Sequence, residues 1–138
     1  MGPLKIQLGK DSSNNPGAWV EFVAGHAPVF VAQNHWVGFD FDGTISGTDN
    51  AGHFEPPYPL GEPIPEMIET VKSLLAAGIK VKIFTARACE PESIPIVQDW
   101  TERHGLGRLE VTHQKDYDLI RFFDDRAIPT DPEKHQKG

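Results

Sequence analysis

Residues 36–44, WVGFDFDGT, run an apolar stretch directly into two carboxylates and a glycine. A stretch that is apolar on both faces is typical of a strand buried in a parallel sheet, and open α/β sheets bind ligands at the carboxyl ends of such strands. Residues two apart point to the same side of a strand, so Asp40 and Asp42 can converge on one ligand while Phe39 and Phe41 face the core. The two carboxylates repel each other, which predicts a metal ion or a lysine nearby.

Composition bounds the class of protein. The chain has 138 residues, enough for one domain, with 38% hydrophobic and 24% charged residues. Its net charge of −7 argues against broad binding to nucleic acid or to anionic membranes. A single cysteine cannot form an internal disulfide, and the sequence contains neither a membrane-length apolar run nor a signal-peptide core. We therefore expect a cytoplasmic protein.

The first part of the chain predicts a small β-meander at the edge of the main sheet. Three strand-like segments, 5–8, 19–23 and 29–32, are separated by runs of turn-forming residues. The pattern leaves open whether the meander completes the core, overhangs the site or pairs with a second copy in a homo-oligomer. We divide the chain into this extension at 1–35, a catalytic core at 36–130 and a polar tail at 131–138.

A strand, helix and strand unit follows the first carboxylates. Residues 43–62 are predicted to form a loop that borders the site, and residues 63–77 a helix. Its apolar face comprises Ile64, Met67, Ile68, Val71 and Leu75. The next strand, 79–85, ends at Thr85. Because the crossover between parallel strands is right-handed, Thr85 is expected near Asp40.

The remaining elements bring further polar groups to strand ends. A helix is predicted at 93–104, with Ile96, Val97 and Trp100 facing inward. A strand at 109–112 is followed by Lys115, and a strand at 119–123 is followed by a second acidic pair, Asp124 and Asp125.

These residue types suit phosphate chemistry. Carboxylate oxygens beside a phosphate are ligands that Mg²⁺ prefers. The Thr85 hydroxyl can bond a phosphoryl oxygen or simply cap a turn, and Arg87 can clamp a substrate or pair with a carboxylate. Cys89 has no activating base in the sequence around it. The six histidines lack the spacing of a zinc site.

Together the four strand ends resemble the motifs of the haloacid dehalogenase (HAD) superfamily, over residues 36–128. In chain order that family has a DxD opening, a Thr or Ser, a Lys and an acidic pair, which match Asp40 with Asp42, then Thr85, Lys115, and Asp124 with Asp125. The resemblance implies an α/β fold, with a three-layer Rossmann-like core and a mainly parallel sheet. Neither gap between motifs has room for a cap domain, so the chain is most similar to the compact capless phosphatase-like subgroup.

The resemblance also implies roles for single residues. Asp40 resembles the nucleophile that forms an aspartyl-phosphate, and Asp42 the general acid and then base. Mg²⁺ would be bound by Asp40, the Asp42 backbone carbonyl, Asp124 and Asp125. Thr85 and Lys115 would position and neutralise the phosphoryl group. Only eight residues separate Lys115 from Asp124, fewer than the family often has, so Arg87 and Arg108 are substitutes for it. Substrate contacts are expected from Gly43, Thr44, Ala86 and Arg87.

The expected function is Mg²⁺-dependent hydrolysis of a phosphomonoester. The substrate is a small-molecule or polymer-end phosphate ester, with a nucleotide, a sugar phosphate and a polynucleotide end all open. The alternatives are a phosphotransferase that uses the same residues and an inactive phosphate-binding module. A phospho-acceptor signalling domain gathers similar residues, but in a different chain order.

Overall fold

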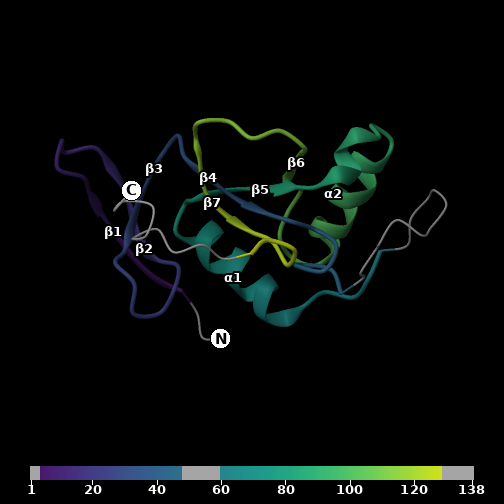
Figure 1. Cartoon of the computed structure of the whole chain (residues 1–138), viewed down its shortest axis with the longest axis horizontal. Coiled ribbons are helices and arrows are strands. Elements are labelled where there is room, and N and C mark those ends of the chain that lie inside the picture. The colour runs from purple at the N-terminus through teal and green to yellow at the C-terminus, as the bar shows by residue number, and fades with distance from the viewer. Residues whose placement is uncertain (1–3, 48–59, 129–138) are drawn as a thin grey trace.

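The computed structural model describes residues 4–47 and 60–128 (Figure 1). Its elements are β1 (Lys5–Lys10), β2 (Pro16–Glu21), β3 (Val29–Ala32), β4 (Trp36–Phe39), α1 (Pro65–Ala76), β5 (Lys80–Phe84), the 3₁₀ helix η1 (Ala86–Cys89), α2 (Ser93–Arg103), β6 (Glu110–Thr112) and β7 (Leu119–Phe123). All the predicted helices and strands are present. The largest shift is in β2, which begins at Pro16 rather than Trp19.

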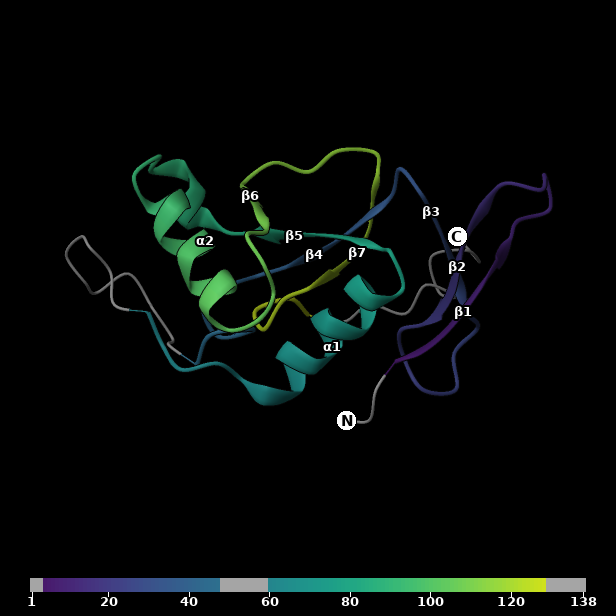
Figure 2. The ribbon, with the colours of Figure 1, turned by 180° about the vertical axis from the view of Figure 1, so that it is seen from behind.

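A four-stranded parallel sheet in the order β6-β5-β4-β7 carries the second part of the chain, which confirms the α/β class. β4 lies inside this sheet, and all four of its residues are buried. Apolar side chains of one sheet face, including Val37, Phe39 and Ile83, form a single core with residues of α1 and α2. Figures 1 and 2 show α1 along the sheet and α2 beside β6.

On the other face of the sheet, a loop lies where a helix was expected. β6 and β7 are joined by residues 113–118, about half the dozen residues that a crossover containing a helix needs. This loop contacts Trp36, whose indole N–H donates to Asp116 at 2.8 Å and whose backbone N–H donates to the Asp118 carbonyl at 2.8 Å. Within residues 4–47 and 60–128 both α-helices therefore pack on one face, and the predicted three-layer arrangement is not seen.

The first three strands form a sheet of their own, in the order β1-β2-β3, so the prediction that they lie at the edge of the main sheet is wrong. Their inward side chains Ala18, Val20 and Val31 belong to the same buried core as the parallel sheet. Phe22, just after β2, lies 6.1 Å from Phe123 between ring centroids. Of the three roles left open by the sequence, this segment completes the core.

Two predicted interior positions also differ. In α1, Ile68 and Val71 are buried as expected, but the fully buried leucine of the last turn is Leu74 rather than Leu75. In α2, Val97 and Trp100 are buried while Ile96 is 41% exposed. The described helices include none with the length and apolar character needed to cross a membrane.

Candidate active site

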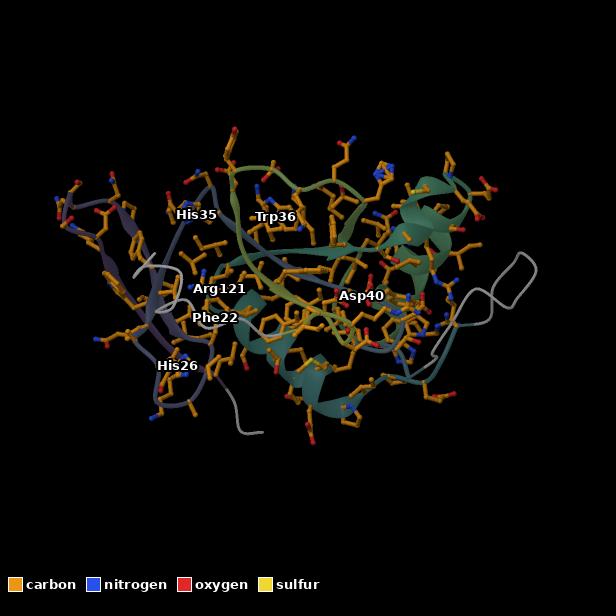
Figure 3. All side chains as sticks on the ribbon, in the orientation of Figure 1. Phe22, His26, His35, Trp36, Asp40 and Arg121 are labelled. Atoms are coloured by element: carbon orange, nitrogen blue, oxygen red, sulfur yellow. The ribbon has the colours of Figure 1, made fainter. Side chains whose placement is uncertain are left out.

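Three carboxylates meet at the carboxyl edge of the parallel sheet. The Asp40 N–H donates to the Phe123 carbonyl at 2.8 Å, which continues the pairing of β4 with β7 past the end of both strands. Asp124 and Asp125 therefore come next to Asp40. One carboxylate oxygen from each of the three acids lies within 4.8 Å of the others. Figure 3 labels Asp40 on the side of the molecule away from the N-terminal sheet.

This proximity changes the proton affinity of Asp40. Burial is the largest cause, and a hydrogen bond with Asp125 and repulsion from the Asp124 and Asp125 charges add to it, raising the pKa of Asp40 to about 7. The backbone N–H of Phe41 opposes the shift. Near neutral pH the cluster must hold a proton or a cation, and a divalent metal ion satisfies all three acids at once.

The turn after β4 fixes the position of Asp125. Gly43 has a φ of +84°, which glycine adopts without strain, and a Cβ there would lie 2.4 Å from Asp125 Oδ2, so a larger residue would displace this carboxylate. The Thr44 hydroxyl donates to Asp125 Oδ1 at 3.2 Å and accepts from the Asp125 N–H at 3.1 Å. Gly43 and Thr44, predicted as substrate contacts, are thus placed in this structure to orient a carboxylate.

Asp42 is paired with Arg87. Nε and Nη2 of the arginine donate to the two carboxylate oxygens at 2.7 and 2.8 Å, a bidentate pair in which both side chains are largely buried. Thr85 helps to place the arginine, because its hydroxyl accepts the Arg87 N–H at 3.2 Å and caps η1. Two roles were expected for Arg87, a clamp on substrate or a pair with a carboxylate, and this structure shows the carboxylate pair.

A cavity of about 540 Å³ opens beside these groups. Of the predicted site residues, it collects Asp40, Asp42, Thr85, Ala86, Arg87 and Asp124. Its other lining residues are Phe84, Cys89, Glu90, His113, Phe122 and Arg126. Phe84, Phe122 and His113 were not expected here, although a glycine inside a buried strand, Gly38, is a signal that other groups approach closely.

Lys115 is not among the residues that line the cavity. It lies exposed in the 113–118 loop, next to Asp116, which bonds Trp36 at the beginning of β4 and so at the far end of that strand from Asp40. In the described part of the chain, the cations at the cavity are Arg87 and Arg126.

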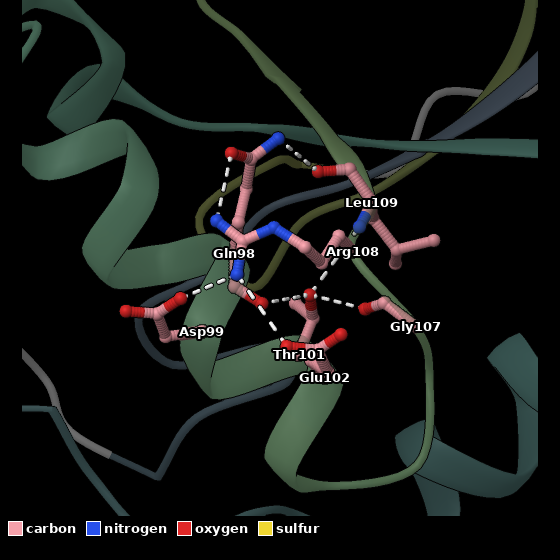
Figure 4. A network of polar contacts seen from close by, with 7 residues as sticks. All are labelled: Gln98, Asp99, Thr101, Glu102, Gly107, Arg108 and Leu109. Atoms are coloured by element: carbon pink, nitrogen blue, oxygen red, sulfur yellow. Dashed lines mark hydrogen bonds and ion pairs between the residues drawn. The ribbon is translucent and has the colours of Figure 1, made fainter.

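Arg108, the other substitute for the lysine, belongs to a separate cluster on α2 (Figure 4). It pairs with Asp99 and lies 3.5 Å from Glu102. The neighbouring Thr101 hydroxyl is within hydrogen-bonding distance of the Gln98 and Gly107 carbonyls, at 2.9 and 2.7 Å. This network joins the helix to the segment that leads into β6.

Comparisons of the chain with protein-family models, with curated proteins and with solved structures found no match. Evidence for a function therefore comes from the geometry of the site and the order of its motifs. Part of the loop expected to border the site, residues 48–59, lies outside the described residues.

Proposed function

We propose that this chain is a Mg²⁺-dependent phosphatase of the capless HAD type, which hydrolyses phosphomonoesters through an aspartyl-phosphate on Asp40. The observation that carries the proposal is the convergence of Asp40, Asp124 and Asp125 to within 4.8 Å at one strand edge. Thr85 and Arg87 line the same cavity as Asp40, so a hydroxyl donor and a guanidinium accompany the acids.

The donor set suits Mg²⁺, because it consists of carboxylate oxygens in a partly buried place where burial first, and then the neighbouring acids, raise the pKa of Asp40. Asp40, Asp124 and Asp125 would hold the ion, whose charge would offset the negative charge of the phosphoryl group. The Asp42 backbone carbonyl is the fourth ligand suggested by the family resemblance.

Hydrolysis then divides into two displacements at phosphorus. A carboxylate oxygen of Asp40 forms a bond to phosphorus as the bond to the alcohol oxygen breaks, and the alcohol leaves with a proton. Water then attacks the aspartyl-phosphate, which releases inorganic phosphate and restores the Asp40 carboxylate. Within the described residues the Thr85 hydroxyl accepts from Arg87 N–H but donates to no protein group, so its hydrogen can serve a phosphoryl oxygen.

Asp42 is proposed to deliver the proton to the leaving alcohol. In the structure both of its oxygens accept hydrogen bonds from Arg87, so the carboxylate is already engaged before a substrate binds. The phosphate of a substrate is a competing anion for the guanidinium. We propose that Arg87 moves from Asp42 to a phosphate oxygen on binding, which leaves Asp42 able to carry the proton.

A non-catalytic phosphate-binding module is the second candidate. The same Asp42–Arg87 pair favours it, because a permanently paired Asp42 cannot act as an acid, and Lys115 does not line the cavity. Phosphoryl transfer to a second alcohol would use the same residues as hydrolysis.

The test is phosphate release from a panel of phosphomonoesters with Mg²⁺. Asp40→Asn is expected to lower kcat/KM by at least about 1,000-fold, because amide oxygen is a poor nucleophile, and EDTA should abolish turnover. Asp99→Asn, the same change in the cluster on α2, should keep turnover within about twofold of the wild type. Equal turnover by Asp40→Asn and the wild type would overturn the proposal. Mg²⁺-dependent phosphate binding without release would favour the binding module.

A further inference from the structure

Two aromatic rings meet across the middle strand of the parallel sheet, close to Asp40. Phe84 of β5 and Phe122 of β7 flank β4, and their ring centroids are 4.8 Å apart with an interplanar angle of 86°. The strand between them carries Gly38, which is registered with Phe122. A Cβ on Gly38 would come within 3.2 Å of the Phe122 ring and 3.0 Å of Trp36. The glycine therefore leaves the space that the Phe122 ring needs.

The Phe84 and Phe122 pair, called here the aromatic platform, is part of the cavity that contains the acids. Both rings line it, and both are only half-buried, unlike the fully buried Phe39 and Phe41 on the opposite face of the sheet. Asp40 directly follows β4 and its N–H continues the pairing with β7, so the side-chain positions of Gly38 and Asp40, two residues apart, lie on the same face. Phe122 is registered with Gly38, about 7 Å along the strand from Asp40, whereas Phe84 follows Ile83, the residue registered with Phe39, and so lies beside Asp40.

We propose that the cavity binds a nucleoside monophosphate, with its phosphate at Asp40 and its base against the aromatic platform. This inference rests on the proposed function for the position of the phosphate. Partly exposed aromatic rings beside a phosphate-binding group suit a flat aromatic ligand, since bases stack on such rings. The spacing of about 7 Å between Asp40 and Phe122 leaves room for a sugar between the phosphate and that ring.

The size and the polar rim of the cavity fit the same ligand. Its volume of about 540 Å³ falls within the range of small-molecule sites, about 300–1,000 Å³. Glu90 and His113 also line it and supply hydrogen-bonding groups for the edge of a base or for ribose hydroxyls.

The test compares adenosine 5′-monophosphate with ribose 5-phosphate, which has the same phosphate and sugar but no base. With Mg²⁺, wild-type kcat/KM is expected to be at least about tenfold higher for the nucleotide. Phe122→Leu keeps an apolar side chain but removes the ring, and it should reduce that ratio to below about threefold. Phe30→Leu makes the same change in the N-terminal sheet, away from the cavity, and should leave the ratio unchanged.

A binding measurement separates this inference from the proposed function. In calorimetry with the Asp40→Asn protein and Mg²⁺, the nucleotide should bind at least about tenfold more tightly than ribose 5-phosphate. If the nucleotide binds more tightly but the wild type does not hydrolyse it, the aromatic platform is supported and the phosphatase proposal is overturned. Hydrolysis of both esters at equal kcat/KM, or a ratio that Phe122→Leu does not change, would overturn the platform alone.

Discussion

The molecule gathers charged side chains in two places, and the two clusters are built in opposite ways. On α2, Asp99 and Glu102 face Arg108, and a network of hydrogen bonds joins them to the next segment (Figure 4). At the edge of the parallel sheet, Asp40 meets Asp124 and Asp125, and burial together with these neighbours raises the pKa of Asp40 to about 7. In the first cluster an arginine of the chain pairs with the acids, whereas in the second the acids repel one another until a proton or a cation binds.

The contrast continues within the opening motif. Asp42 lies two residues from Asp40, yet a buried arginine takes both of its oxygens. Asp42 is therefore paired with a positive charge, whereas Asp40 lies among like charges. Such an arrangement costs stability and is typical of functional sites.

The largest expected effect comes from making the same substitution in both clusters. Asp124→Asn should lower kcat/KM for a phosphomonoester at limiting Mg²⁺ by at least about 100-fold, because it removes charge that binds the ion. Asp99→Asn should change it by no more than about twofold. Equal losses in the two variants would show that the clusters do not differ in role.

Metal binding should relieve the repulsion at the sheet edge. At Mg²⁺ concentrations 100 times the dissociation constant, the free energy of unfolding should rise by about 2.7 kcal/mol. The measurement is thermal unfolding in Mg²⁺ and in EDTA, with Asp124→Asn as the variant that should lose the response. An equal melting temperature in Mg²⁺ and in EDTA would contradict a metal site here.

Without metal, Asp40 should destabilise the fold in a pH-dependent way. The folded pKa is about 7 and the ordinary value is 3.8, so the folded protein binds more protons between these pH values and loses stability as pH rises through them. In EDTA at pH 8, Asp40→Asn should therefore be more stable than the wild type by about 1–2 kcal/mol, a figure reduced for solvent screening at this half-buried site.

Urea unfolding between pH 4 and pH 8 checks this dependence, and the advantage of Asp40→Asn should vanish near pH 4. Asp99→Asn should show no comparable gain in stability at pH 8. A wild type that gains stability relative to Asp40→Asn as the pH rises would show that the carboxylate is not under repulsion.

The smallest effect is expected in the cluster of Asp99, Glu102 and Arg108 on α2. Arg108→Ala removes ion pairs from a partly exposed surface, so it should lower the melting temperature by only a few degrees at low salt and less at high salt. A large loss that salt does not affect would mean that this cluster is as important to the molecule as the sheet edge.

Much of the frame could be predicted because it depends on local patterns. The positions of β4, β5 and β7 could be predicted from apolar runs that end in polar residues. Because these strands are parallel, Thr85 and Asp124 then lie at the same edge of the sheet as Asp40. The separate N-terminal sheet could not be predicted, since its packing depends on the shape of a core that no single segment specifies.

The partners of individual side chains could also not be predicted from the sequence. Arg87 had two plausible partners, a substrate and a carboxylate. Only the geometry of η1 shows that the guanidinium reaches Asp42 in this structure. The meeting of Phe84 with Phe122 depends on strand order, which places two residues distant in sequence on either side of β4. The short loop at 113–118, in place of a helix, leaves this face of the sheet with a cavity.

The most direct measurement is a crystal structure of the protein grown with Mg²⁺ and beryllium trifluoride, which mimics a phosphoryl group on a carboxylate. We expect the ion about 2.1 Å from oxygens of Asp40 and Asp124, with the fluoride group on Asp40. Finding the ion elsewhere, or Asp40 and Asp124 too far apart to share it, would contradict the account.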